Sequence, residues 1–181
     1  MHPLISELHQ DHVNLGRLLG LLQRELDRLR SGESPDYFLL IDVIDYIESY
    51  PDQIHHPRED VIFRVYLASH QSEAEDVKRL MEEHESLVVE SHQMRRAVEQ
   101  VTQSAVSSRD ALETQLAQFI ARQWDHLNLE EGRIFRVLSE SLTEAEWRQI
   151  EADLPSAVDP IFGGAVQQRY QAIYDQIMIG S

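Results

Sequence analysis

The sequence predicts an all-α fold: an antiparallel up-down-up-down four-helix bundle with a C-terminal helical extension. Apolar residues recur at intervals of three and four along four long segments, which is the spacing of one face of an α-helix. The chain has only 7 glycines and 6 prolines in 181 residues, too few for an all-β protein built on tight turns. Short connections between the segments are typical of helices that alternate in direction.

The first two segments are separated by clear helix stop and start signals. Ser31-Gly32 ends the first helix, and Ser34-Pro35 is typical of the start of the next one. Pro51 should kink the second helix, because proline removes a backbone N–H and clashes with the preceding turn. The predicted inward stripe of the first helix is Leu8, His12, Leu15, Leu19, Leu22, Leu26 and Leu29. That of the second is Leu40, Ile44, Ile47, His55, Glu59, Ile62 and Tyr66.

The third and fourth segments have the same periodicity, with a turn expected at Ser107-Ser108. The inward stripe of the third helix is Val77, Leu80, His84, Leu87, Ser91, Met94, Val98 and Val101. That of the fourth is Leu112, Leu116, Phe119, Gln123, His126, Glu130, Ile134 and Leu138.

The chain beyond about residue 140 is predicted to be an extension of the same domain. Thr143 and the acidic residues after it indicate the start of a short helix that runs to about Asp153. Pro155 breaks the chain, Gly163-Gly164 forms a turn, and a last helix is expected from about residue 165 to 178. Its packing residues are Val166, Tyr170, Ile173, Tyr174 and Ile177. We therefore divide the chain into a bundle, residues 1–140, and an extension, residues 141–181.

Composition excludes several classes of partner and site. The formal charge of −16 repels nucleic acid and anionic lipid, so we expect neither as a partner. The absence of cysteine excludes disulfides and thiolate metal sites. The N-terminal residues lack a secretory pattern, and no apolar run approaches the roughly 20 residues needed to span a membrane. The expected location is cytoplasmic, and the sequence identifies no protein partner.

The first half of the bundle is repeated in the second half. Leu8-x3-His12 matches Leu80-x3-His84, and the sequence Ile-Phe-Arg-Val occurs at residues 62–65 and again at 134–137. The spacing from the first histidine to the second is 43 residues in one half and 42 in the other. The bundle therefore consists of two helix pairs related by an approximate twofold axis.

Each predicted helix carries one histidine on its apolar stripe, and two of these histidines are followed four residues later by a glutamate. Residues four apart lie on the same face of a helix, so each such pair places an imidazole and a carboxylate in the interior. An unpaired buried carboxylate costs several kcal/mol, and the chain has a single lysine, Lys78, to offset such charges. The simplest account is a metal centre with six ligands: His12, His55, Glu59, His84, His126 and Glu130.

The ligand types indicate which metal would bind. A mixed nitrogen and oxygen set without thiolate favours iron or manganese over structural zinc, although zinc can bind such ligands as a substitute. Six protein ligands are too many for one tetrahedral ion and fit two octahedral ions. Two assignments stay open. Glu131 competes with Glu130, because aligning the repeated Ile-Phe-Arg-Val places it opposite Glu59; His56 with Asp60 competes with His55 and Glu59.

Two stretches, HHPREDVIF at residues 55–63 and HLNLEEGRIF at residues 126–135, carry a family resemblance. With His12 and His84 they resemble the hemerythrin-like HHE cation-binding family of bacteria over roughly residues 4–140. The resemblance implies a non-haem di-iron centre that binds O2, NO or peroxide-type ligands, in oxidative or nitrosative stress handling. Oxygen-carrying hemerythrins have a second histidine one turn after His84, where this chain has Val88, so we expect one iron to be under-coordinated.

The sequence leaves open whether the protein is an enzyme. One alternative is a di-iron enzyme that decomposes peroxide, or a repair protein that donates iron. Another is an iron sensor or a structural metal module.

Overall fold

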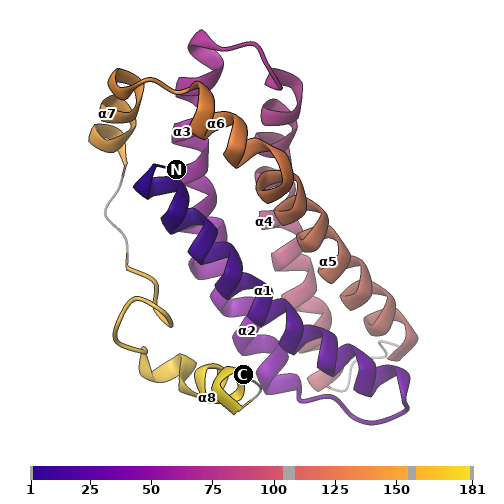
Figure 1. Ribbon diagram of the computed structural model, residues 1–181. Helices are drawn as coiled ribbons and strands as arrows, with labels where there is room; N and C mark the ends of the chain where they lie inside the picture. Colours follow the sequence, from indigo (N-terminus) through magenta and orange to yellow (C-terminus); the bar gives the residue numbers. More distant parts are fainter. Residues whose placement is uncertain (1, 104–108, 155–157, 180–181) are drawn as a thin grey trace.

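A computed structural model describes residues 2–103, 109–154 and 158–179, and within these ranges the protein is all-helical. Four long helical segments lie side by side in alternating directions and form the predicted antiparallel bundle, with further helices C-terminal to it (Figure 1). The predicted turn at Ser107-Ser108 and the break at Pro155 lie outside the described residues.

Two of the four bundle helices are continuous α-helices, and two contain a π-helical turn. The continuous helices are α1 (Pro3–Arg30) and α4 (Ala74–Thr102). The second bundle helix is formed by α2 (Tyr37–Ser49), the π turn η1 (Pro51–His55) and α3 (His56–Ser69). The fourth is formed by α5 (Arg109–Leu129), the π turn η2 (Glu130–Ile134) and α6 (Phe135–Ser141).

The stop and start signals act close to the predicted places. Gly32 adopts φ +89° after α1, a conformation that favours glycine. The α2 helix begins at Tyr37, slightly later than predicted, because the Asp36 carboxylate caps it by accepting the backbone N–H of Leu39 at 3.0 Å. The sequence placed this start at Ser34-Pro35.

The π turns explain why the internal repeat changes register. A π turn spans i to i+5 and so holds one residue more than an α-helical turn. In η1 the N–H of His56 donates to the carbonyl of Pro51, and in η2 that of Phe135 donates to the carbonyl of Glu130. The extra residue in η1 precedes the His-x3-Glu pair of the first half, whereas the extra residue in η2 follows that pair in the second half.

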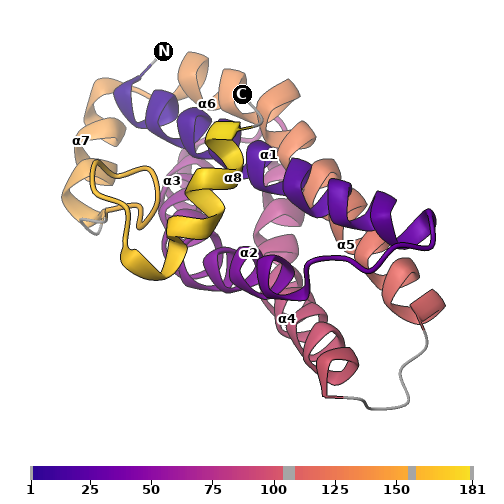
Figure 2. The ribbon, with the colours of Figure 1, turned by 90° about the horizontal axis from the view of Figure 1, so that it is seen from below.

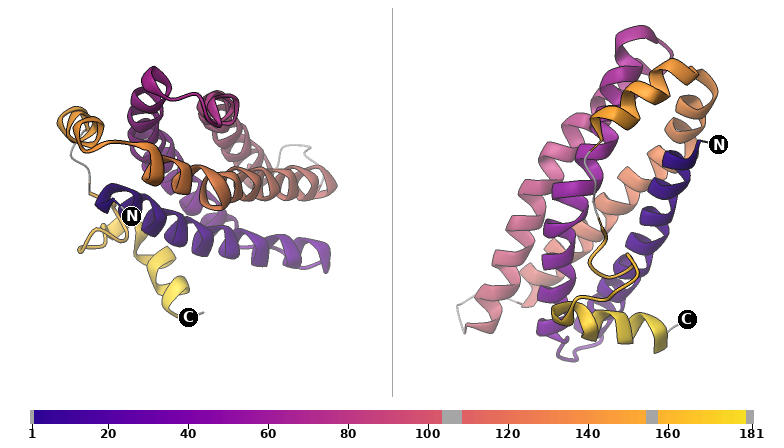
Figure 3. Two further views of the ribbon diagram at one scale, coloured as in Figure 1. Left: turned by 45° about the horizontal axis from the view of Figure 1, so that its top comes forward. Right: turned by 90° about the vertical axis from the view of Figure 1, so that its left-hand side faces the viewer.

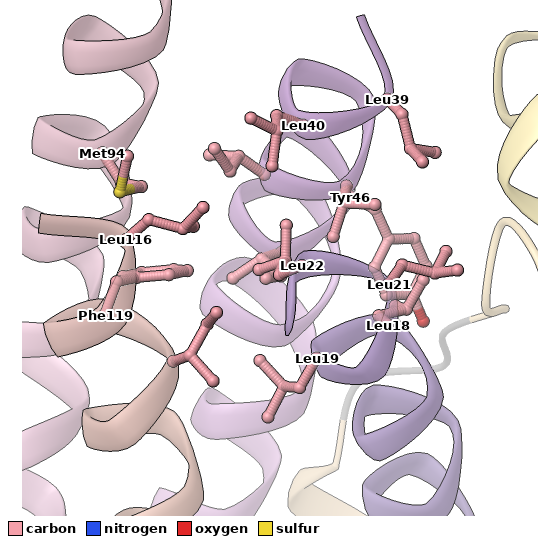
Figure 4. Close-up of a cluster of buried hydrophobic side chains, with 14 of the residues drawn as sticks. Leu18, Leu19, Leu21, Leu22, Leu39, Leu40, Tyr46, Met94, Leu116 and Phe119 are labelled. Atoms are coloured by element: carbon pink, nitrogen blue, oxygen red, sulfur yellow. The ribbon is translucent and has the colours of Figure 1, made fainter. Parts of the chain in front are cut away.

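Two hydrophobic clusters fill the bundle. The larger, around Leu22, Leu40 and Leu116, includes leucines of α1 and α2 that face Met94 of α4 and residues of α5 (Figure 4). The smaller, around Leu8, Phe63 and Trp147, fills the other part. Along each bundle helix the predicted metal ligands come between residues of the two clusters, so a polar layer separates them.

The C-terminal extension reaches both parts of the bundle. The helix α7 (Glu144–Asp153) begins with a capping box between Thr143 and Glu146 and packs on α3. A 3-10 turn, η3 (Gln168–Tyr170), leads into α8 (Gln171–Ile179), so the last helix starts later than residue 165.

The helix α8 contacts α1 and α2 at the other end of the bundle, and residues 158–167 before it lie on the outside of the bundle (Figures 2 and 3). Of the predicted packing residues, Tyr170, Ile173 and Ile177 are buried, whereas Val166 and Tyr174 remain partly exposed. No helix in the described ranges has a segment long and apolar enough to cross a membrane.

Candidate metal centre

The carboxylate of Glu59 lies at the centre of the polar layer and is fully buried. One of its oxygens, Oε1, lies 3.4 Å from Nε2 of His12 and 3.3 Å from Nε2 of His55. The other, Oε2, lies 3.5 Å from Nε2 of His84. The Glu59 carboxylate therefore faces histidines from both halves of the bundle.

Glu130 has the equivalent position in the second half and is also fully buried. Its Oε2 lies 3.4 Å from Nε2 of both His12 and His126, and its Oε1 lies 3.5 Å from Nε2 of His84. The sequence left Glu130 and Glu131 open, and the structure places Glu130 inside. All six residues predicted from the sequence thus meet in one buried layer, although their binding of a metal stays a prediction.

Several nitrogen and oxygen atoms of this layer that could bind a metal have no hydrogen-bond partner among the described residues. Within the described residues, both carboxylate oxygens of Glu59 and of Glu130 are buried and unpaired, as are Nε2 of His84 and of His126. Leaving such groups buried without partners is costly, so a water or an ion that pairs with them would stabilise the protein. Nitrogen and oxygen atoms directed at a common point are the donors that a divalent transition metal requires.

A second set of four carboxylates, which we call the outer carboxylates, surrounds this layer: Asp11, Asp60, Glu83 and Glu131. In the first half, Nδ1 of His12 donates to Glu131 at 2.8 Å, and Nδ1 of His55 donates to Asp11 at 3.0 Å. A carboxylate on Nδ1 fixes the tautomer and turns Nε2 toward the centre, as it does for histidines that bind metals.

The second half repeats this arrangement. Nδ1 of His84 donates to Asp60 at 2.8 Å, and Nδ1 of His126 donates to Glu83 at 3.1 Å. From the sequence, Asp60 and Glu131 were expected only as rival ligands, and Asp11 and Glu83 were not expected at the site. A signal was available, because each outer carboxylate is adjacent in sequence to one of the six predicted ligands.

His56 also lies in the polar layer. The sequence left His55 and His56 as alternatives, and the structure places both of them in this layer. The imidazole of His56 is buried, stacks on that of His84 with ring centroids 4.5 Å apart, and meets that of His126 edge-on at 5.4 Å. In a regular α-helix two consecutive side chains point about 100° apart, so regular periodicity places only one of two neighbouring histidines on the inward face. The extra residue of η1 changes which residues after Pro51 face inward.

The candidate ligands form two groups that share Glu59. One consists of His56, Glu59, His84 and His126, and the other of His12, His55 and Glu59; the ligand atoms within each group lie within 4.8 Å of one another. The structure places the His56 imidazole beside His84, on the side where Val88 replaces a histidine, so the expectation of one under-coordinated iron stays a prediction. The group with fewer imidazoles is the one in the first half.

Proton binding partly balances the charges in the metal-free protein. Burial lowers the pKa of His12 and of His55, but the surrounding carboxylates together outweigh it, chiefly Glu131 and Glu59 at His12 and Glu59 and Asp11 at His55. They raise the two pKa values to about 9 and about 10. His84 behaves in the same way, with a pKa of about 10 caused by Asp60 and Glu130 against burial. A metal must therefore displace protons from these imidazoles.

His56 differs from the other histidines in its charge. Burial, together with the nearby imidazoles of His84 and His126, lowers the pKa of His56 well below its usual value. Its imidazole is neutral at pH 7, which is the form that binds a metal.

Comparison with known proteins gives one result. The family model described as "Hemerythrin HHE cation binding domain" matches residues 4–138, which include all the candidate ligands and all but the ends of the bundle. Comparisons with curated proteins and with solved structures give no match.

Proposed function

The chain belongs to the hemerythrin HHE cation-binding family, and on that premise we propose that it holds two iron ions and binds O2, NO or a peroxide-type ligand at them. The observation that carries this proposal is the pair of ligand groups that share Glu59. A single ion would leave part of these buried donors unpaired. Two ions would account for both groups, with Glu59 and Glu130 among the residues that would hold them.

The two proposed metal positions are unequal. His56, His84 and His126 would bind one ion, and His12 and His55 the other. The ion with two imidazoles has more of its coordination left for an external ligand. Bound iron would supply reversible one-electron chemistry and an open position for such a ligand.

The protein's own residues prepare the site for that role. The outer carboxylates hold the four stripe imidazoles in one orientation before metal arrives. The two hydrophobic clusters on either side of the layer keep bulk water away from the centre. Both features favour a centre that admits a small ligand and excludes larger molecules.

A surface cavity provides an approach to the first half of the site. It has a volume of about 310 Å³, and its lining includes Asp11 and Tyr50. Asp11 accepts hydrogen bonds from Nδ1 of His55 at 3.0 Å and from the Tyr50 hydroxyl at 3.3 Å. Asp11 therefore connects the wall of the cavity to His55, one of the candidate ligands.

The proposal is tested by loading the metal-free protein with Fe(II) under argon and measuring metal content and optical spectra before and after adding azide, NO or air. We expect two iron ions per chain, with new charge-transfer absorption when NO is added to the Fe(II) protein or when azide is added after oxidation in air. One tightly bound zinc ion with no capacity for a second metal would contradict the proposal.

The alternative roles give different outcomes in the same preparation. Sustained turnover of hydrogen peroxide would favour the peroxide-decomposing enzyme, and iron transfer to an acceptor protein would favour the repair protein. A large loss of helical structure on chelation, without any response to small ligands, would favour the sensor or structural module.

A further inference from the structure

Asp52, in the π turn η1, is a buried carboxylate that the features described so far do not explain. Its side chain is 2% exposed, and both of its oxygens lack a hydrogen-bond partner within the described residues. Burial raises its pKa to about 6, an effect that the Ser91 hydroxyl opposes. A carboxylate in such a place is costly unless it binds a proton or a cationic partner.

The group best placed to pair with Asp52 is His56. Its Nδ1 lies 3.6 Å from Oδ1 of Asp52, too long for a hydrogen bond, and Nδ1 is itself buried without a partner. The two residues are four apart in the same helix, so a small side-chain movement would close the contact. The other four histidines of the layer already have a carboxylate on Nδ1.

The second half of the bundle shows that this pair is an addition to the repeated pattern. The residue three before His126 is Gln123, and the residue after it is Leu127, so these occupy the places of Asp52 and His56. Leu127 is buried in the larger hydrophobic cluster. The chain therefore has an acidic residue and an imidazole together in one half, and neither of them in the other.

We propose that Asp52 is the positioning residue of His56: it accepts the Nδ1 proton, directs Nε2 at a divalent transition metal, and makes the His56 position fill first. This inference rests on the proposed two-metal site. Imidazoles whose second nitrogen is held by a carboxylate are better metal ligands, because their tautomer and orientation are fixed before binding. Asp52 also places a negative charge beside the His56 imidazole, and in a layer of low dielectric constant such a charge attracts a metal cation.

The test uses Co(II), whose visible absorption reports its ligands, titrated into the metal-free full-length protein under argon with a competing chelator. Asp52→Ala should weaken the first Co(II) equivalent by roughly 10- to 100-fold and change its visible spectrum. Asp52→Asn should restore most of the affinity, because its amide oxygen still accepts from Nδ1. Asp52→Leu is the second variant if Asp52→Ala loses helical structure, and it should show the same loss of affinity.

Two controls separate positioning from a general structural effect. Asp159→Asn changes another buried aspartate, which accepts from the Tyr46 hydroxyl at 2.7 Å, and it should leave Co(II) affinity unchanged. In a His56→Leu background, Asp52→Ala should have no further effect on Co(II) binding, because the imidazole that it positions is gone.

Nitrogen NMR of the Zn(II)-loaded protein provides an independent measurement. His56 should carry its proton on Nδ1 and the metal on Nε2. Unchanged first-equivalent affinity in folded Asp52→Ala or Asp52→Leu, or metal bound to Nδ1 of His56, would overturn the inference. Wild-type protein that takes up fewer than two Co(II) ions would instead contradict the proposed two-metal site, which is a different result.

Discussion

The two helix pairs of the bundle share a histidine and a His-x3-Glu pair, and they differ in the position of a π turn and in the residues beside it. Each pair supplies a histidine from its first helix and a His-x3-Glu pair from its second, with an outer carboxylate on every Nδ1. The π turn ends at the histidine of the His-x3-Glu pair in the first half and begins at its glutamate in the second. The position of one extra residue thus allows a symmetric repeat to form a centre with unequal sides.

The register of the repeat records the same difference. His12 and His84 are 72 residues apart, as are Ile62 and Ile134, but Glu59 and Glu130 are 71 apart. The separation between matched residues falls from 72 to 71 after η1 and returns to 72 after η2, because each π turn adds one residue to its own half.

The largest expected effect comes from removing a carboxylate that both halves use. Glu59→Ala should lower the metal content from two ions to less than one, because Glu59 belongs to both ligand groups. Elemental analysis after Fe(II) loading is the measurement. Glu48→Ala is a matched control, since Glu48 is buried but pairs with Arg95 and His92 away from the layer. Two retained ions in folded Glu59→Ala would show that Glu59 bridges nothing.

A smaller loss should follow when the two halves are made alike. His56→Leu gives the first half the residue found at Leu127 in the second, and it should weaken one metal equivalent while leaving the other in place. Truncating a direct ligand should cost at least as much affinity as the roughly 10- to 100-fold typical of an outer partner. Titration with Co(II) separates the two equivalents; equal weakening of both would mean that the halves do not bind separate ions.

The outer carboxylates test whether the halves are equivalent apart from η1. Asp60→Asn and Glu131→Gln remove the charge from matched positions, as do Asp11→Asn and Glu83→Gln. Each change should weaken metal binding by roughly 10- to 100-fold. Within each matched pair the loss should be similar, and chelator competition measures it. A loss confined to one half would break the proposed equivalence.

The last effect concerns the metal-free protein and appears as a change in unfolding temperature. Folding raises the pKa of His12, His55 and His84 from 6.5 to between about 9 and about 10. Their contribution to stability is therefore complete below pH 6.5 and is lost as the pH rises through these values.

Thermal unfolding followed by circular dichroism should thus show the metal-free protein losing stability between neutral pH and pH 10. Metal-loaded protein should lose much less, because metal has replaced the protons on these imidazoles. Metal-free and metal-loaded proteins with parallel pH profiles would contradict this account.

Much of the fold and most of the inner site follow from the sequence. The 3.6-residue period identified the inward stripe on each bundle helix, and it correctly placed His12, Glu59, His84 and Glu130 in the interior. The period could not reveal that His55 and His56 both enter the layer, because it assumes regular turns. Pro51 indicated an irregularity in the second helix, but no residue type signals η2.

The periodicity of a single helix could not predict the outer carboxylates, for a different reason. Asp11 contacts His55 and Glu83 contacts His126, so both pairs depend on how two neighbouring helices are aligned. Within one helix, each of these acids is merely a polar residue beside an inward histidine. The register between helices is set by packing of the two hydrophobic clusters, which the sequence pattern does not specify.

The central claim is that two metal ions lie between these halves and share their carboxylates. Crystals of the iron-loaded protein, measured on both sides of the iron absorption edge, test it most directly. The account predicts two anomalous peaks in the polar layer, one beside His56, His84 and His126 and one beside His12 and His55, with Glu59 between them. A single peak in that layer, or iron bound only outside it, would contradict the claim.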